Sequence, residues 1–415
     1  MGTLTLVDDR GATSTVPLAA PPALTPPAAP LRSRLVYAAA HVVPVPWGDN
    51  TPGSPAQIDW DATLGFRRHL YRWGLGVADA MDTAQRGMGL DPAATGELVR
   101  RSAEVAREER GALVVGVGTD HLADPAPGLD AVADAYVAQL HAAEDAGAGP
   151  VLMASRQLAR VATGPDDYRR VYRRVLRAAG GPVVLHWLGT AFDPALAGYF
   201  GADLPTATRT LLDVVDEHAD RVAGVKMSLL DADAEIAVRE RLPAGVRMFT
   251  GDDFHYVGLI GGADLAGADL AGAEARAVPG RDGRAAGPHG HSDALLGAFA
   301  ALGPLASAAV QALDAGDAAG YLRLLGPTEA LSRQVFAAPT PHYKAGIAFL
   351  AWLNGYQSAY RMVGGLHAAR SVPHLSEIVR LANACGALEQ PELAAERWHA
   401  LLRLDGVAVA GRSTP

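Results

Sequence analysis

Cysteine, long apolar runs and a leading hydrophobic segment are all scarce or absent in this sequence of 415 residues. Cys385 is the only cysteine, which excludes an internal disulfide and suits a reducing compartment. The longest apolar run, residues 35–47, is interrupted by prolines and is shorter than the ~20 residues of a membrane span. Charged residues at positions 8–10 stand where a signal peptide needs its apolar core. We therefore expect a cytoplasmic protein with no membrane partner.

The chain also lacks a basic tract. Its 45 acidic residues outnumber 36 Lys and Arg residues, and the net charge of −9 is spread along the sequence. Nucleic acid is therefore not an expected partner. A hydrophobic content of 49% with 20% charged residues allows a large core and excludes global disorder. The length suits an α/β barrel with an appendage.

Lysine is the rarest of the charged residues, since only Lys226 and Lys344 stand among the 36 basic residues. An arginine stays protonated at working pH, whereas a partly desolvated lysine amine can lose its proton and attack a carbonyl. Lys226 lies near the end of a short apolar run, residues 222–227, between two helix-like segments. This pattern is typical of a buried parallel strand, whose carboxyl end carries catalytic side chains in a βα barrel. Lys226 is therefore a candidate Schiff-base nucleophile, and the alternative is an ion pair inside the barrel.

Strand-like and helix-like segments alternate from residue 34 onward. The predicted strands are residues 35–43, 76–81, 112–118, 150–154, 182–187, 222–227, 245–250 and 291–298. This rhythm is typical of parallel βα units, and so many units in one run favour a closed barrel over an open sheet. The expected fold class is therefore α/β, as a (β/α)8 TIM barrel followed by a C-terminal helical appendage.

Other segments flank and interrupt the expected barrel, which we place at residues 32–303. Residues 1–31 have the pattern of a hairpin followed by a Pro/Ala-rich strap. Residues 304–415 have the pattern of a helical region. A Gly/Ala/Asp-rich, low-complexity insertion lies near residues 261–290, and we expect it to project beside the barrel mouth.

A closed barrel would bring the ends of its strands to one mouth. There we expect His186 to act with Lys226, because an imidazole titrates near neutral pH and can shuttle the proton that imine chemistry needs. The expected substrate-binding residues are Asp79, Asp82, Thr83, Ser155, Asp252, Asp253, His255 and His291. The same reasoning places near the mouth His41, Asp120, His121, Gln157, Trp187 and His289. For paired aspartates the simpler alternative is a helix cap.

Different functions fit these residues. An imine at Lys226 would withdraw electrons from a bound keto compound, so that a neighbouring C–C bond could break or form, or water could leave. Asp and His on several strands could instead hold a divalent metal in a sugar isomerase or epimerase. No compact ligand motif such as H-E-x-x-H supports a metal site. A catalytically silent sugar-binding barrel is the third alternative.

Four motifs occur in an order that resembles a known family. They are VVLHW at 183–187, VAGVKMS at 222–228, TGDD at 250–253 and PTPHYKAGIAFL at 339–350. Their order is similar to that in the dihydrodipicolinate synthase and N-acetylneuraminate lyase superfamily of class I aldolases, and in detail to a divergent branch of it. The resemblance runs from about residue 35 to about residue 402.

This resemblance implies a (β/α)8 barrel with a C-terminal helical bundle, a Schiff base on Lys226 and no cofactor. It also implies a homo-oligomer, either a dimer or a tetramer built from dimers. Lys344 matches the family's Pro-x-x-x-Lys helix start, where we expect a structural role.

The chain departs from the family where the family binds a keto acid. His186 stands in place of the Tyr that shuttles protons, and the Arg that usually follows is missing from HWLGTAFD at 186–193. The sequence DAMDTAQRG at 79–87 replaces the Gly-Thr-Thr-Gly-Glu loop that holds the donor's carboxylate. An acidic loop suits sugar hydroxyls better than a carboxylate. We therefore expect an imine-forming aldolase, lyase or dehydratase of carbohydrate catabolism that acts on a small keto sugar or keto sugar-acid derivative.

Overall fold

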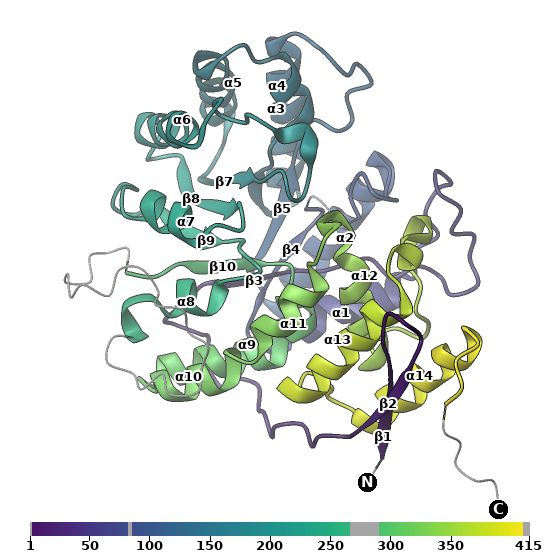
Figure 1. The fold of residues 1–415 in the computed structure, drawn as a ribbon. Helices are drawn as coiled ribbons and strands as arrows, with labels where there is room; N and C mark the ends of the chain where they lie inside the picture. The colour runs from purple at the N-terminus through teal and green to yellow at the C-terminus, as the bar shows by residue number, and fades with distance from the viewer. Residues whose placement is uncertain (1, 82–84, 266–289, 410–415) are drawn as a thin grey trace, which may run out of the picture.

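Eight parallel strands close into a barrel at the centre of the molecule (Figure 1). The computed structural model describes residues 2–81, 85–265 and 290–409. The barrel strands are β3 (Val36–Ala39), β4 (Gly76–Asp79), β5 (Leu113–Val117), β6 (Gly149–Leu152), β7 (Val183–Leu188), β8 (Val222–Ser228), β9 (Arg247–Thr250) and β10 (Asp293–Leu296). Neighbours in the barrel follow the order of the chain, and β10 pairs with β3 to close it. The predicted (β/α)8 barrel is confirmed, and each predicted strand overlaps an observed one.

The strands alternate between two faces, because successive side chains of a strand point in opposite directions. Inward-facing residues form a small core of their own, which contains Tyr37, Ala39, Ala78, Met81, Val114, Val151, Met153, Val184, Phe249 and Leu295. Glycines make room for the large rings in this core. A Cβ on Gly76 would lie 2.5 Å from the Tyr37 ring, and one on Gly224 would lie 2.7 Å from the Phe249 ring. The apolar residues that face outward pack against the helices in the main core.

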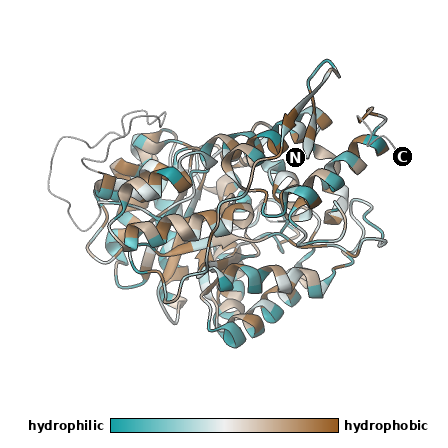
Figure 2. Ribbon diagram, turned by 90° about the horizontal axis from the view of Figure 1, so that it is seen from below, coloured by the Kyte–Doolittle hydropathy of each residue, from teal (hydrophilic) through white to brown (hydrophobic). Residues whose placement is uncertain are grey.

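Helices between the strands form the outer layer of the barrel (Figure 1). They are α1 (Trp60–Arg72), α2 (Pro92–Glu109), α3 (Leu129–Asp145), α4 (Arg156–Val161), α5 (Pro165–Ala178), η1 (Pro194–Leu196), α6 (Leu204–Glu217), α7 (Ala232–Arg239), α8 (Tyr256–Gly261) and η2 (Gly262–Leu265). Aspartate side chains at positions 59, 91, 203 and 231 accept hydrogen bonds from backbone N–H groups in the first turns of α1, α2, α6 and α7. Such caps satisfy N–H groups that have no partner within a helix. The helices at the edge of Figure 2 carry hydrophilic residues on their outer side.

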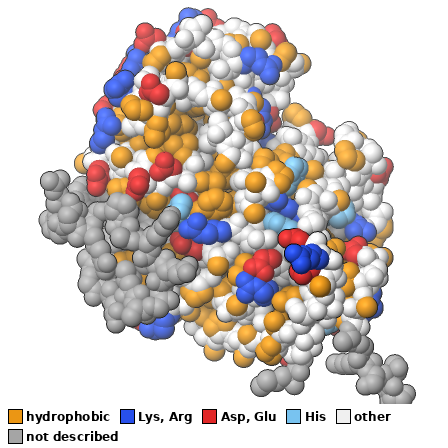
Figure 3. Space-filling model, in the orientation of Figure 1, with side chains coloured by type: hydrophobic (Ala, Val, Ile, Leu, Met, Phe, Trp, Pro, Cys, Tyr) orange, Lys and Arg blue, Asp and Glu red, His pale blue; other side chains and the backbone are white. Residues whose placement is uncertain are grey.

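Arginine rather than lysine forms the ion pairs on this outer layer. Arg173 of α5 makes a two-point contact with Glu217 of α6, and Arg170 contacts Asp130 of α3 at 2.9 Å. Figure 3 shows basic and acidic side chains next to each other along the upper left edge, where α5 and α6 lie. Exposed pairs of this kind contribute about 0–1 kcal/mol each. Arginines therefore form these surface ion pairs, and lysine is not needed for them.

The C-terminal helices pack beside the barrel and over one side of its mouth. They are α9 (Phe299–Asp314), α10 (Ala318–Leu325), α11 (Thr328–Val335), η3 (Thr340–His342), α12 (Lys344–Leu353), η4 (Val363–Ala369), α13 (Val372–Cys385) and α14 (Pro391–Leu404). Gly326 and Pro327 separate α10 from α11. A proline has no N–H to donate and disfavours helical geometry in the residue before it.

The N-terminal hairpin of β1 (Thr3–Val7) and β2 (Thr13–Pro17) lies against α13 and α14 (Figure 1). The Val7 N–H donates to the Ser376 hydroxyl at 2.8 Å, and the Trp398 indole N–H donates to the Thr5 carbonyl at 2.6 Å. The first and last parts of the chain are therefore held together. In the described ranges, no helix combines the length and the apolar character that a membrane crossing requires.

Candidate active site

Lys226 points into the barrel near the carboxyl end of β8. The strand register places it beside His186 of β7 and Phe249 of β9. Val225 and Met227 belong to the core under the helices, so the alternation of the strand turns Lys226 and Ser228 inward. Lys226 is 8% exposed. Its amine therefore lies inside the mouth and is largely shielded from water.

Gly251, which follows β9, leaves the space that the Lys226 side chain uses. A Cβ at position 251 would lie 2.1 Å from the Ser228 hydroxyl oxygen, 2.7 Å from the Met227 carbonyl oxygen and 2.8 Å from the Lys226 Cε. The Lys226 side chain and the Ser228 hydroxyl therefore meet at one point of the barrel wall.

We expect Gly251→Ala to lower turnover at least tenfold and to destabilise the fold by about 1–3 kcal/mol, because the backbone carbonyl of Met227 prevents an easy adjustment. Steady-state kinetics and urea unfolding measure the two effects. Gly65→Ala is the matched control, since nothing lies within 4 Å of a Cβ at that position of α1. Full activity in Gly251→Ala would contradict the packing described for Lys226.

His186 forms a buried polar pair with Ser228. The Nε2 atom of His186 lies 3.1 Å from the Ser228 hydroxyl oxygen. Burial, aided by the positive charge of Lys226, holds the pKa of His186 well below its usual value. The imidazole is therefore neutral at pH 7, and it can exchange a proton with the hydroxyl that lies beside Lys226. Ser228 was missed in the sequence, although its spacing of two residues from Lys226 in a strand places both on one face.

Lys344 reaches the same mouth from the start of α12. Its Nζ donates a hydrogen bond to the carbonyl oxygen of Ala39 at the end of β3 and lies 5.0 Å from the centre of the Tyr343 ring. Burial lowers the pKa of Lys344 to about 7, and its charge interacts with Asp253 and Lys226. The structure thus brings both lysines of the chain to the mouth of the barrel. The sequence had predicted only a structural role for Lys344 and did not predict that it lies near Lys226.

Asp253 is the carboxylate that both lysines share electrostatically. It is 3% exposed, and its Oδ1 accepts a hydrogen bond from the Ala298 N–H at 2.9 Å. Burial raises the pKa of Asp253 to about 7, while that hydrogen bond and the charges of Lys226 and Lys344 act in the opposite direction. This arrangement places Asp253 where it can hold or release a proton near neutral pH.

Three aromatic rings cover the mouth from the side of the C-terminal helices. Phe336 and Tyr343 stack with their ring centres 4.1 Å apart, and Phe192, after β7, meets both edge-on at 6.3 Å. Phe336 and Tyr343 lie over Gly297, where a Cβ would be 2.7 Å from the Tyr343 ring and 2.8 Å from the Phe336 ring. This apolar cover limits the access of water to the lysines, which strengthens electrostatic interactions below it.

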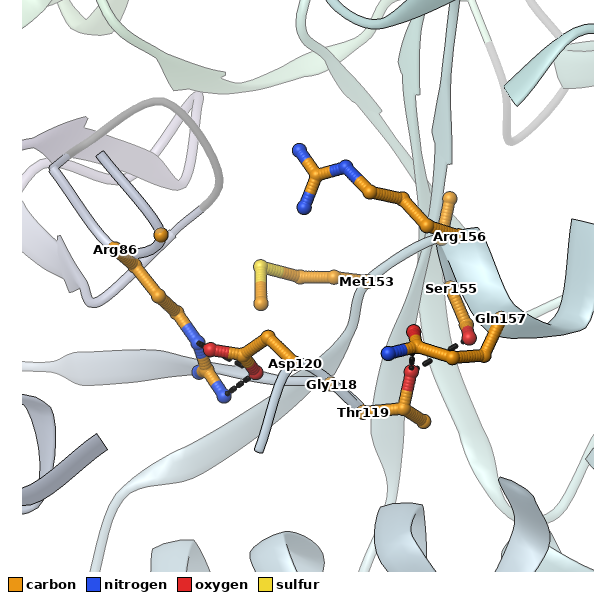
Figure 4. A pocket seen from close by; sticks show the side chains of 10 residues that line it. Arg86, Gly118, Thr119, Asp120, Met153, Ser155, Arg156 and Gln157 are labelled. Carbon is orange, nitrogen blue, oxygen red and sulfur yellow. Dashed lines mark hydrogen bonds and ion pairs between the residues drawn. The ribbon is translucent and has the colours of Figure 1, made fainter. Parts of the chain in front are cut away.

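Other expected residues lie at the mouth with local partners. Asp252 accepts hydrogen bonds from the backbone of Phe254 and His255, so it has the role of a turn cap. Its other oxygen lies 2.9 Å from His255 Nδ1, and this hydrogen bond raises the pKa of His255. Ser155 caps α4 through the Leu158 N–H and lines a separate hollow with Asp120 and Gln157 (Figure 4).

The structure corrects the expectation for Asp79. The residue ends β4, but its carboxylate faces α1, where it forms a two-point ion pair with Arg67 at 2.6 and 3.1 Å. Both side chains are fully buried. Asp79 is therefore enclosed between the sheet and the helix and cannot contact a substrate in the barrel.

The expectation for His291 is also corrected. The strand β10 begins at Asp293, so His291 precedes it and lies at the amino end of the barrel, opposite the mouth. Burial lowers the pKa of His291 to about 4, and Arg34, just before β3, contributes to this shift. Trp187 faces outward and packs on Phe200 with ring centres 5.8 Å apart.

Some expected residues have other positions or are outside the described ranges. His41 is buried with its Nε2 at 2.7 Å from the Gln357 Oε1, and burial lowers its pKa to about 3. Asp82, Thr83 and His289, with most of the insertion near 261–290, lie outside the described residues. Within the described residues, no group of three or more His, Cys, Asp or Glu side chains is placed to hold a metal ion.

Comparison with solved structures shows the same architecture in dihydrodipicolinate synthases. The synthase from Bacteroides thetaiotaomicron matches with a TM-score of 0.60 and 14% identity over 85% of this chain and 99% of its own. The 4-hydroxy-tetrahydrodipicolinate synthase from Methylacidiphilum fumariolicum SolV matches with a TM-score of 0.59 and 15% identity over 87% and 99%. The synthase from Thermotoga maritima gives 0.59 and 13% over 86% and 99%. At these identities the likeness shows a shared fold, which confirms the resemblance at the level of structure.

The family comparison covers nearly the whole chain. No curated protein matches the sequence. The family model described as "Protein of unknown function (DUF993)" matches residues 4–407, which include the hairpin, the barrel and the C-terminal helices. The chain therefore belongs to the DUF993 family, on a barrel that it shares with the dihydrodipicolinate synthases.

Proposed function

We propose that the protein is a class I aldolase-like lyase, of the aldolase or dehydratase type, that forms an imine through Lys226. The observation that carries this proposal is the placement of Lys226 inside a covered barrel mouth, next to a neutral histidine and a buried carboxyl group. A lysine amine in a desolvated site is a nucleophile for carbonyl carbons. The 34 arginines, which make up the rest of the 36 basic residues, cannot supply this chemistry.

The reaction begins when the unprotonated Lys226 amine adds to the substrate's carbonyl carbon. Loss of one water molecule then gives an iminium ion, which accepts the electron pair of a neighbouring C–C bond or stabilises the carbanion that expels a hydroxyl group. A proton must move to or from the substrate in each case. Ser228, in contact with His186, lies beside Lys226 and is the group we assign to this transfer.

We further propose that the substrate is a keto sugar or a keto sugar-acid derivative. The sequence that follows β4 lacks the loop with which the related family holds a keto acid's carboxylate. Asp79 is enclosed behind the sheet and therefore does not support binding of a sugar. The support for a sugar comes instead from the polar residues that line a hollow after β5 and β6.

The experiment for this function is imine trapping with borohydride across a panel of keto sugars and keto acids. A stable mass adduct with at least one keto sugar is expected, and turnover of that compound should persist in EDTA. If no carbonyl compound gives an adduct while EDTA removes activity, the imine mechanism is contradicted and the metal-dependent alternative stands.

His186→Phe should lower turnover by about 10²-fold or more, because a ring of similar shape fills the space but cannot exchange a proton with Ser228. Imine trapping should persist in this variant, since Lys226 is unchanged. Ser228→Ala should show the same separation of trapping from turnover. Normal turnover in His186→Phe would assign the proton transfer to another group. Asp253 is then the candidate, because its pKa of about 7 lets it hold or release a proton at neutral pH.

A further inference from the structure

A second polar hollow opens at the mouth, beside the ends of β5 and β6 (Figure 4). It contains about 300 Å³ of empty space, part of which is open to solvent. Its lining includes Arg86, Thr119, Asp120, Met153, Ser155 and Gln157. These residues come from the segments that follow β4, β5 and β6, which end at the same face of the barrel as β8.

The register of the strands gives the separation between the backbone at Lys226 and the backbone at Met153, which lines the hollow. The register of β6 with β7 pairs Leu152 with Leu185, so the next residue, Met153, lies beside His186. His186 is in turn paired with Lys226. Met153 and Lys226 are thus separated by two strand spacings, or about 10 Å between their backbones. A substrate with its carbonyl at Lys226 can reach this hollow with the far end of its carbon chain.

The cations around the hollow are already neutralised. Arg86 is buried, and it makes a forked contact with Asp120 while its other N–H groups bond the carbonyl oxygens of Ala80 and Gly116 and the amide oxygen of Gln139. It therefore has no N–H group left for an anionic ligand. Arg156, above the hollow in Figure 4, pairs with Asp193.

A chain of hydrogen bonds orients the remaining polar groups. The Thr119 hydroxyl donates to the Gln157 amide oxygen at 2.8 Å and lies 2.6 Å from the Ser155 hydroxyl, which itself accepts from the Leu158 N–H. With its oxygen held in this way, Gln157 turns its amide nitrogen toward Gly118 and Asp120, into the hollow (Figure 4). An N–H₂ donor and a carboxylate acceptor thus face the same space.

This combination matches a hydroxyl group, which donates one hydrogen bond and accepts others. A ligand carboxylate or phosphate would find no available cation here, because Arg86 is paired with Asp120 and Arg156 with Asp193, so its own charge would be desolvated without a partner. Met153 also lines the hollow, and its flexible thioether suits the carbon side of a sugar chain.

We propose that this hollow, which we call the Gln157 subsite (Thr119, Asp120, Ser155 and Gln157), binds the hydroxyl-bearing far end of an uncharged keto sugar whose carbon chain is long enough to reach it from Lys226. The inference rests on the proposed imine at Lys226 and narrows it, because a sugar that ends in a carboxylate or phosphate is excluded from the subsite.

The test compares a long and a short probe in wild-type protein and in Gln157→Leu. D-fructose spans both sites, whereas dihydroxyacetone reaches only Lys226. Borohydride trapping is measured as a function of probe concentration. In the wild type we expect half-maximal trapping at a lower concentration of fructose than of fructose 6-phosphate. In Gln157→Leu the concentration needed for fructose should rise at least tenfold, with no change for dihydroxyacetone. Gln311→Leu, the same exchange on α9, is the control.

The outcomes separate the two proposals. Equal trapping of fructose by Gln157→Leu and by the wild type, or an equal loss for both probes, would overturn the subsite and leave the imine mechanism intact. A preference of the wild type for fructose 6-phosphate would also overturn it. If neither probe nor any other ketone is trapped by the wild type, the proposed function itself fails.

Discussion

Lys226→Arg should abolish turnover and imine trapping, with a loss of at least about 10³-fold in rate. Arginine keeps a positive charge that faces Asp253, but its guanidinium does not lose a proton at working pH and cannot form the imine. The substitution therefore separates the two roles that a lysine can have in this barrel. Trapping with borohydride and steady-state kinetics on the folded variant measure the loss.

An ionic role for Lys226 makes the opposite prediction. If its charge serves only to balance Asp253, Lys226→Arg retains most of the activity and Lys226→Ala loses stability. The imine role requires that both variants are inactive and that circular dichroism shows both to be folded. Lys344→Arg makes the same exchange at the other lysine of the mouth, and imine trapping on Lys226 should persist in the folded variant, because Lys226 is unchanged. Intact turnover in Lys226→Arg would contradict the proposed mechanism.

Arg67→Met should destabilise the protein by about 3–5 kcal/mol, because it leaves the Asp79 carboxylate buried without its cation. Arg67 also donates to the carbonyl oxygens of His41 at 2.6 Å and Thr63 at 2.9 Å, and these bonds are lost as well. Urea unfolding followed by circular dichroism measures the change in the free energy of unfolding. Both side chains of this pair are fully buried, so we expect a larger effect than from the exposed ion pairs between the outer helices.

The double variant Arg67→Met with Asp79→Leu tests the cause of that loss. Replacing both charges by apolar groups removes the unpaired carboxylate, so much of the stability should return. The single variant Asp79→Asn should be destabilised, yet the fraction that remains folded should give normal imine trapping. Loss of trapping in folded Asp79→Asn would contradict the position of Asp79 behind the sheet and restore it as a substrate-binding residue.

The fold could be predicted because each barrel strand is a short apolar run between helical segments. This signal is local. Many Ala and Gly residues make helices and strands look alike in the sequence, so the predicted strand ends were displaced by a few residues, but each strand was still found. The position of Lys226 near the end of such a run was equally local. Ser228 could have been included by the same reasoning, because residues two apart in a strand share a face.

The side on which a strand residue lies was harder to predict. Asp79 is one residue beyond the inward-facing Ala78, and a shift of one residue moves a side chain from the barrel interior to the helix side. His291 was placed at the mouth although it begins the predicted strand 291–298, and the amino end of a parallel barrel strand lies opposite the mouth. Lys344 donates a hydrogen bond to the Ala39 carbonyl oxygen, 305 residues away in the sequence. A contact between such distant positions cannot be predicted from local sequence patterns.

The central claim is tested most directly by finding which lysine carries the reduced adduct. Trypsin cuts after Arg221, Lys226 and Arg239, so an adduct on Lys226 blocks the middle cut and yields one peptide of residues 222–239. After borohydride reduction with a keto sugar, we predict this peptide with the added mass, and normal cleavage after Lys344. An adduct on Lys344 alone, or normal cleavage after both lysines with every keto compound tried, would contradict an imine at Lys226.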